Sequence, residues 1–188
     1  MTTRSEAFAA QAASDLDAYE TLAKSTLPSS HRLHYLQMWL EKLCKAYLWL
    51  PDATDEGLRG RHNVVDRVLP RMIQEHWLRI GFTQRPNNDS LRQLCREVDL
   101  LHPKADDNGR RPDNVEYPWI GASGDSEVPA PFTGCTDRRL APWIGASGDS
   151  EVPARWEFSL VRRLYTNPGK LLIKAAVSLT RNPAIFIR

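Results

Sequence analysis

The sequence predicts an all-α fold. In several segments apolar residues recur at steps of three and four, which is the period of a helix with one buried face. Alternation of apolar and polar residues, which would indicate strands, is nearly absent. Pro, Ser and Asn residues separate the periodic segments, as expected at helix ends. We therefore expect about four to five helices, a long irregular loop and a short basic helix at the C-terminus.

The composition agrees with one soluble protein of this class. Of 188 residues, 41% are hydrophobic and 26% are charged, which is ordinary for a globular chain. Apolar runs are only a few residues long, so we expect no membrane span. The first 20 residues are too acidic for a signal peptide, which favours a cytoplasmic location. The three cysteines lack CxxC spacing, so we expect neither disulfides nor a metal site, and no cofactor.

Two helices are expected in the first 50 residues. The first spans about residues 5–24, and Pro28 separates it from the second, for which Ser29 or Ser30 is a candidate N-cap. The second spans about residues 31–50 and is apolar over much of its girth. Such a helix must be covered on two sides, either by its own core alone or also by a second subunit.

Two further helices are expected before residue 103. One spans about residues 62–80 and should kink at Pro70, because proline removes a backbone donor and crowds the preceding turn. The next is capped by Asp89 and ended by Pro103. No sustained period is present in residues 104–158. A last helix has Asn167 as its expected N-cap and Pro168 as its first residue.

An exact duplication lies in the irregular stretch. The segment PWIGASGDSEVPA occurs at residues 118–130 and again at 142–154. Structural repeats drift in sequence and need several units, so we interpret the pair as a recent tandem duplication or an artefact that lengthens a loop, with a functional pair as the alternative. Removing residues 118–141 should leave the core unchanged.

Three regions follow from these patterns: a helical bundle over residues 1–117, the irregular loop over 118–154, and a basic extension over 155–188. The extension carries seven Lys or Arg residues against one acidic residue, Glu157. Candidate nucleic-acid contacts in it are Arg162, Arg163, Lys170 and Lys174. The alternatives are an anionic membrane surface and a solvated face of the domain.

Two short polar motifs contain residue types that could carry chemistry. The two GDS triplets resemble a serine nucleophile, but the last histidine, His102, lies before both of them, so a turn is the better interpretation. His102 with Asp99, Asp106 and Asp107 could chelate a divalent cation, or these residues form a solvated acidic loop.

Arg71 and His76 are a second candidate pair. Five residues apart on a helix, they do not stack as i and i+4 neighbours do. They could converge with groups of a second subunit, where His76 would move a proton and Arg71 would stabilise a phosphorane-like transition state. The alternative is a histidine at the edge of the core beside a surface arginine.

Three segments together resemble HEPN domains. They are LQMWLEKLCKAYLW at residues 36–49, RHNVVDRVLP at 61–70 and VEYPW at 115–119. The matching residues are Glu41, Lys42, Lys45, Ala46, His62, Val64, Val65, Tyr117 and Pro118. The resemblance implies an up-and-down helical bundle that forms a homodimer. It also implies a toxin-antitoxin or phage-defence role, with a nucleotidyltransferase-type antitoxin or another protein as partner and RNA as ligand.

The same resemblance implies a metal-independent endoribonuclease site near the end of the bundle. There the chain has Arg110 and Arg111, followed by Asn114 and Tyr117, and no histidine. In this interpretation Arg111 or Arg110 stabilises the negative charge that develops on the phosphate, and Asn114 or Tyr117 orients the phosphate. Arg71 and His76 have the Arg-to-His spacing typical of the family, but they lie one helix earlier in the chain. A non-catalytic module that binds a partner protein or nucleic acid is the alternative function.

Overall fold

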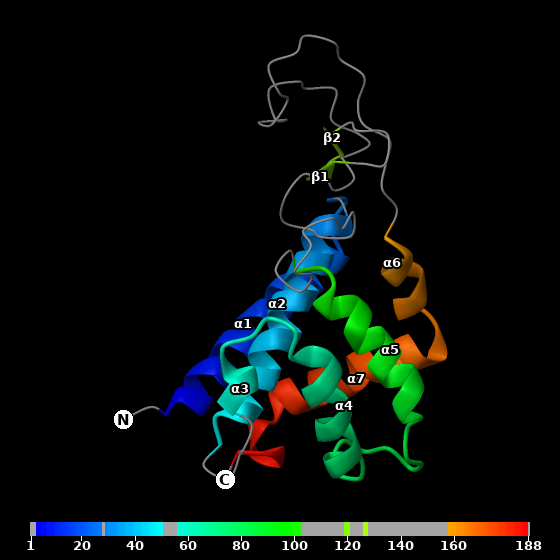
Figure 1. Cartoon of the computed structure of the whole chain (residues 1–188). Helices are drawn as coiled ribbons and strands as arrows, with labels where there is room; N and C mark the ends of the chain where they lie inside the picture. Colours follow the sequence, from blue (N-terminus) through cyan, green and yellow to red (C-terminus); the bar gives the residue numbers. More distant parts are fainter. Residues whose placement is uncertain are drawn as a thin grey trace.

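The described part of the chain is helical, as the sequence predicts. The computed structural model describes residues 3–27, 29–50, 56–102, 119–120, 126–127 and 158–187. Within these residues lie seven α-helices, a short 3₁₀ helix and two paired two-residue strands (Figure 1). The elements are α1 (Arg4–Ala23), α2 (Ser29–Leu48), α3 (Glu56–Arg59), α4 (Val65–His76), α5 (Asn88–Asp99), antiparallel β1 (Trp119–Ile120) and β2 (Ser126–Glu127), α6 (Ser159–Leu164), α7 (Asn167–Arg181) and η3 (Pro183–Ile185).

Helices α1 and α2 form an antiparallel pair. A capping box starts α1: the Thr3 side chain accepts from the Glu6 amide, and the Glu6 carboxylate accepts from the Thr3 amide. Near this end of α1, the Ser5 hydroxyl donates to the carbonyl of Ala46, close to the end of α2, over 2.7 Å. The start of one helix therefore lies beside the end of the other.

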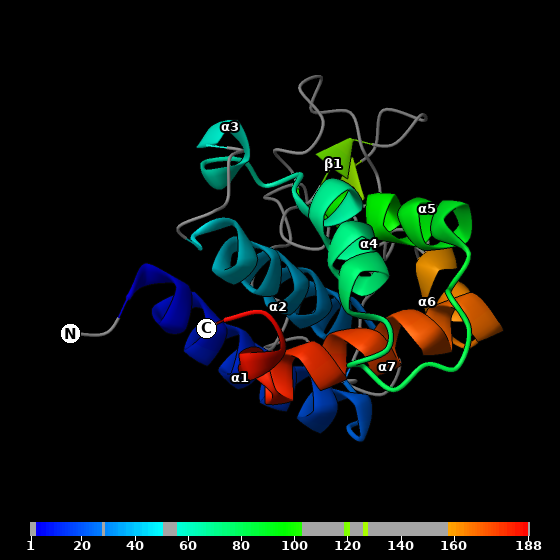
Figure 2. The same cartoon turned by 90° about the horizontal axis from the view of Figure 1, so that it is seen from below.

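Helix α2 is the centre of the core. It contacts α1, α4, α5 and α7 (Figure 2). A stripe of fully buried leucines on α2 is widened by the fully buried Trp39, Cys44 and Ala46. Trp39 is fully buried, and its indole N–H donates to the Thr180 hydroxyl of α7 over 2.7 Å. The broad apolar surface predicted for this helix is thus covered within one chain, and it does not by itself require a second subunit.

Helix starts differ from the predicted caps. Ser29 is already the first residue of α2. The N-cap of α5 is Asn87 rather than Asp89, because the Asn87 side chain accepts from the Ser90 amide over 3.0 Å. The N-cap of α7 is Thr166 rather than Asn167. The predicted caps of α5 and α7 lie two residues and one residue too late, since neighbouring polar residues compete for the position at these ends.

Helices α6 and α7 belong to the same core as the N-terminal helices. Four residues of α7 are fully buried: Leu172, Ala175, Ala176 and Leu179. Helix α7 packs against α1, α2 and α5, while α6 packs against α5 and α7. The expected border at residue 155 therefore does not separate two cores. Among the described helices, none is long and apolar enough to cross a membrane.

Candidate functional sites

Four of the predicted catalytic residues lie outside the described part of the chain. These are Arg110, Arg111, Asn114 and Tyr117, and the acidic residues Asp106 and Asp107 lie there too. The other two, Arg71 and His76, are on α4 and are described together with their neighbours.

The Arg71 and His76 region is a surface cluster of four polar side chains from α2 and α4. The Arg71 guanidinium donates through Nε to Oε1 of Glu75 over 2.7 Å. The Tyr47 hydroxyl donates to the other oxygen of the same carboxylate over 2.5 Å. The ring of His76 meets the ring of Tyr47 edge-on, with the centroids 6.5 Å apart. Glu75 and Tyr47 thus join Arg71 and His76 into one group.

The charges of this surface cluster follow from its contacts. Burial raises the pKa of Glu75, but hydrogen bonds from Arg71 and Tyr47 outweigh burial, so the pKa lies below its usual value. Burial and the hydrogen bond to Glu75 raise the pKa of Tyr47 to about 12. At neutral pH the surface cluster therefore holds a charged carboxylate, a guanidinium, a neutral phenol and an imidazole.

An open pocket of about 350 Å³ adjoins the surface cluster. It is lined by Glu75, His76, Trp77, Leu78 and Arg79. The Arg79 guanidinium donates to the carbonyl of Ile185 over 2.7 Å, which ties this wall to the C-terminal segment. Leu78 is 67% exposed, so the open pocket has an exposed apolar side chain beside its charged ones.

The predicted nucleic-acid contacts lie on α6 and α7. Arg163 forms an ion pair with Glu97 of α5, and the Lys174 ammonium lies 5.4 Å from the ring centroid of Phe82. Arg162 and Lys170 are exposed. Arg163 and Lys174 thus contact other parts of the chain, while Lys170 and Lys174 lie on the side of α7 opposite its buried leucines and alanines.

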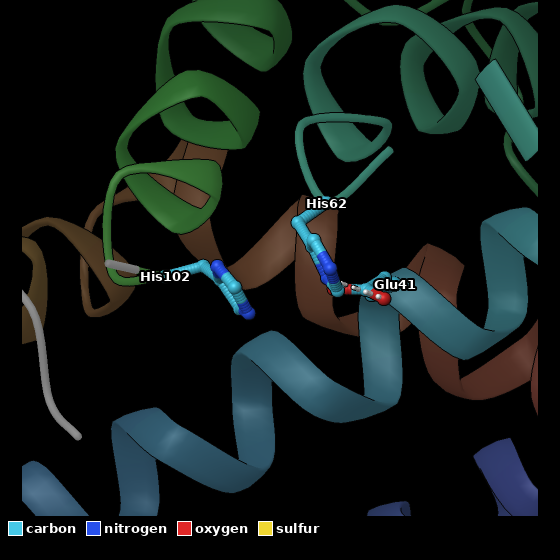
Figure 3. A group of neighbouring side chains, drawn as sticks. All are labelled: Glu41, His62 and His102. Carbon is cyan, nitrogen blue, oxygen red and sulfur yellow. Dashed lines mark hydrogen bonds and ion pairs between the residues drawn. The ribbon is translucent and has the colours of Figure 1, made fainter. Parts of the chain in front are cut away.

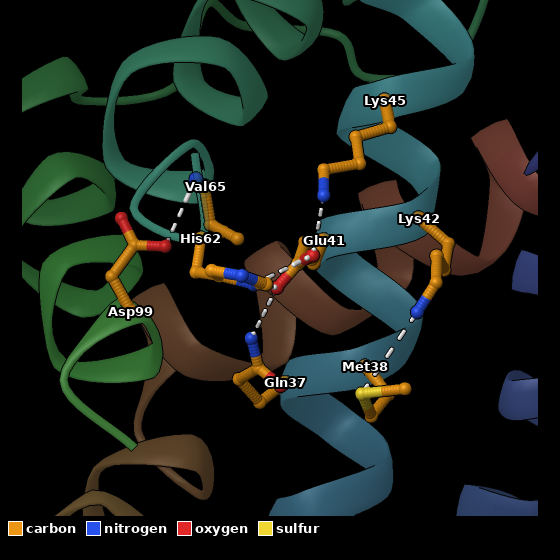
Figure 4. A network of polar contacts seen from close by, with 8 residues as sticks. All are labelled: Gln37, Met38, Glu41, Lys42, Lys45, His62, Val65 and Asp99. Carbon is orange, nitrogen blue, oxygen red and sulfur yellow. Dashed lines mark hydrogen bonds and ion pairs between the residues drawn. The ribbon is translucent and has the colours of Figure 1, made fainter. Parts of the chain in front are cut away.

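A second polar group, which we call the Glu41 cluster, lies between α2 and the ends of α4 and α5 (Figure 3). The Glu41 side chain is only 4% exposed. Its carboxylate accepts from Gln37 over 2.7 Å and from Lys45 over 2.8 Å, and Nδ1 of His62 lies 3.4 Å from it (Figure 4). The ring of His102 stacks on that of His62, with the centroids 4.0 Å apart and 7° between the planes.

Local structure explains how the Glu41 cluster assembles. Gln37, Glu41 and Lys45 succeed one another at i and i+4 on α2, so they share one face. His62 precedes α4, and His102 follows α5. Burial raises the pKa of Glu41, but hydrogen bonds from Lys45 and Gln37 and the nearby charges outweigh it, so the pKa lies below its usual value.

Asp99 has a different role from the cation ligand considered from the sequence. Its two carboxylate oxygens accept from the amides of Val65 and Asp66, over 3.0 and 2.8 Å, and so cap the start of α4. His102 lies instead against His62. Glu41, His62 and His102 each offer one donor atom, and these atoms lie within 4.8 Å of one another. They are the residues of the described structure that could hold a metal ion.

Sequence reasoning did not name Tyr47, Glu75, Glu41 or His62 as site residues. The i and i+4 spacing of Arg71 with Glu75, and of Glu41 with Lys45, was the available signal. The contacts of Tyr47 with α4 and of His62 with α2 join distant segments, and no local pattern encodes them. The whole chain matches no protein-family model, no curated protein and no solved structure at a significant level.

Proposed function

We propose that this protein is a HEPN-like ribonuclease that cleaves RNA without a metal ion. We further propose that the surface cluster around Glu75 is its active site. The observation behind the proposal is that Arg71, Glu75, His76 and Tyr47 join in one group on α2 and α4. A cation, a carboxylate, an imidazole and a phenol are the kinds of group that metal-independent phosphodiester cleavage uses.

The reaction assigns a separate task to each side chain. An imidazole exchanges protons near neutral pH, so His76 takes the proton of a ribose 2′-hydroxyl. The freed oxygen attacks the adjacent phosphorus, and the bond to the 5′ oxygen breaks as His76 returns the proton to it. Arg71, whose side chain is 64% exposed, stabilises the charge that grows on the phosphate oxygens. Glu75 and Tyr47 orient Arg71 through their hydrogen bonds.

The test is cleavage of labelled, structured RNAs by the purified protein in EDTA. Arg71→Ala and His76→Ala should each lower the rate by about 100-fold or more, because each removes a group that acts in the transition state. Matched controls are Arg92→Ala on α5 and His31→Ala on α2, which replace exposed residues of the same types outside the surface cluster. Both controls should keep the wild-type rate.

Other outcomes would revise the proposal in defined ways. Loss of cleavage in Arg111→Ala or Tyr117→Phe, with Arg71→Ala unaffected, would move the site to the segment that the family resemblance indicates. Absence of cleavage by folded wild-type protein would reject the enzymatic function. In that case binding of the same RNAs by Arg162, Arg163, Lys170 and Lys174 would be measured by a shift in fluorescence anisotropy.

The alternative function is a non-catalytic module that binds a partner protein or nucleic acid. The exposure of Leu78 in the lining of the pocket favours it, because an exposed apolar side chain beside charged ones suits a protein contact. The resemblance adds a homodimer and a nucleotidyltransferase-type antitoxin as the expected partners. Light scattering gives the mass of the particle, and a monomer at micromolar concentration would remove the homodimer from the proposal.

A further inference from the structure

We propose that Glu41, His62 and His102 form a binding site for one divalent transition-metal ion of the zinc class. Their donor atoms lie within 4.8 Å of one another, and they come from α2, from the segment before α4 and from the segment after α5. A metal ion at this point would therefore join three separate parts of the bundle (Figure 3). The site is distinct from the surface cluster of Arg71 and His76, and it does not depend on the proposed RNA cleavage.

The ligand types select the class of metal. Two imidazoles and one carboxylate are a frequent protein ligand set for zinc, in which solvent or substrate takes the fourth position. Magnesium and calcium prefer six or more oxygen ligands, and only Glu41 offers oxygen among the three residues. Among first-row ions we expect affinity to rise from manganese through cobalt to copper, and zinc to bind more weakly than copper.

The surroundings of Glu41 prepare it as a ligand. Lys45 contacts Oε1 over 2.8 Å, while Gln37 donates to Oε2 over 2.7 Å (Figure 4). These contacts fix the rotamer of a side chain that is only 4% exposed. A metal ion would share the carboxylate with Lys45, as partners of this kind commonly orient metal-bound carboxylates.

The stacked rings determine which residue must move. Imidazole lone pairs lie in the plane of the ring, so two parallel rings 4.0 Å apart cannot both aim at one ion. One ring must turn before both nitrogens reach a metal at about 2.0–2.1 Å. His102 is buried, with 9% exposure, whereas the side chain of His62 is 37% exposed. We therefore infer that the His62 ring turns to bind the ion. We also infer that the ion reaches the site from solvent on the exposed side of His62.

The experiment uses untagged full-length protein freed of metal with a chelator and then titrated with Co²⁺ and Zn²⁺. Co²⁺ should produce the visible absorption of a four- or five-coordinate complex at one ion per chain, and Zn²⁺ should displace it. Histidine ring signals in the NMR spectrum should shift for two residues, because the stacked pair separates. His62→Ala should weaken Zn²⁺ binding by at least about 100-fold, since it removes a ligand outright.

Controls keep the result interpretable. His62→Ala is the principal variant, because a half-exposed residue can be replaced with little risk to the fold, and circular dichroism checks the fold. His31→Ala replaces an exposed histidine elsewhere on α2 and should bind Zn²⁺ like the wild type. Gln37→Ala removes one contact to Glu41 and should weaken binding by about 10- to 100-fold.

Two results would overturn the inference. Folded wild-type protein without Co²⁺ absorption or Zn²⁺ binding would mean that the Glu41 cluster is only a polar network of the core. Equal affinity of His62→Ala and wild type would place the ion elsewhere, for example on a cysteine. RNA cleavage in EDTA is a separate readout, so failure of the metal site leaves the proposed cleavage standing, and the reverse also holds.

Discussion

Asp99 takes the place of an N-cap that the sequence of α4 lacks. The residue before α4 is Val64, which has no side-chain acceptor, and Asp99 at the end of α5 accepts from the first two amides instead. Burial raises the pKa of Asp99 to about 8, although both backbone hydrogen bonds act to lower it. This cap could not be predicted from the sequence, because its donor and acceptor are 33 and 34 residues apart.

The raised pKa of Asp99 predicts a pH dependence of stability. Between the ordinary aspartate pKa of about 4 and the folded value of about 8, the folded state keeps a proton that the unfolded state loses. The contribution of Asp99 to the free energy of unfolding is therefore full below about pH 4 and is lost as the pH rises toward 8. Urea unfolding at pH 5, 6.5 and 8 measures this change.

The variant Asp99→Asn separates the pH-dependent contribution of Asp99 to the free energy of unfolding from the contributions of the histidines. The amide cannot ionise, but its NH₂ group replaces one of the two oxygens that accept from the amides of Val65 and Asp66, so the variant should be the less stable protein near pH 5. This difference should shrink as the pH rises toward 8, because only the wild type then loses the contribution linked to the proton of Asp99. Stability of the wild type that rises relative to Asp99→Asn over the same interval would contradict the prediction. That outcome would mean that the two backbone hydrogen bonds outweigh burial.

At the scale of elements, the long helices could be predicted and the short ones could not. Residues 4–23, 29–48, 65–76, 88–99 and 167–181 carry the expected apolar spacing and are helical. Helices α3 and α6 have four and six residues, which is too short for a period of 3.6 to emerge. Their helical form depends on packing, and for α6 that packing is with α7 and α5.

Gly169 sets the distance between α6 and α7. A Cβ atom built on Gly169 would lie 2.3 Å from the carbonyl oxygen of Arg163 and 2.5 Å from the Cα of Leu164. Both are backbone atoms, which cannot turn aside as a side chain can, so the two helices would have to separate. Gly169→Ala should therefore lower the free energy of unfolding by about 1–3 kcal/mol.

Gly60→Ala is the matched control for Gly169→Ala. A Cβ atom at Gly60 would meet nothing within 4 Å, and Gly60 has no positive φ. We expect its stability to stay within about 0.5 kcal/mol of the wild type in urea unfolding. A gain in stability from Gly169→Ala would contradict the close approach, because helix propensity alone favours alanine over glycine by about 1 kcal/mol.

At the scale of the molecule, the arrangement of the site follows from tertiary contacts more than from local pattern. The sequence pointed to Arg71 and His76, but it did not reveal that Tyr47 and Glu75 connect them. It marked His102 as a candidate cation ligand and yet paired it with Asp99 rather than with His62 and Glu41. Contacts between residues 21 or more positions apart carry no local periodic signal, so only the folded chain shows them.

At the scale of the whole molecule, the structure differs most from the sequence-based expectation in the C-terminal region. The basic composition of this region predicts an extension of the bundle. Helix α7 buries Leu179 completely and packs against α1, α2 and α5. Composition could not predict this, because the cations of α7 occupy one side while its leucines and alanines occupy the other. The net charge of the segment reflects only the side with the cations, whereas the helical spacing of the apolar residues indicates the buried side.

Leu179→Ala tests whether the C-terminal region is part of the core. Truncation of a fully buried leucine should cost about 2–5 kcal/mol, through lost burial and the cavity left beside the neighbouring helices. In a chain of this length each kcal/mol corresponds to about 2–4 °C in Tm. Leu27→Ala is the matched control, because Leu27 is 50% exposed and should change Tm by only about 1–2 °C. Equal melting temperatures for the two variants would mean that α7 contributes little to the stability of the core. A large decrease in Tm for Leu179→Ala alone would show that α7 is an integral part of the core, where it holds Trp39 and the rest of α2 in place.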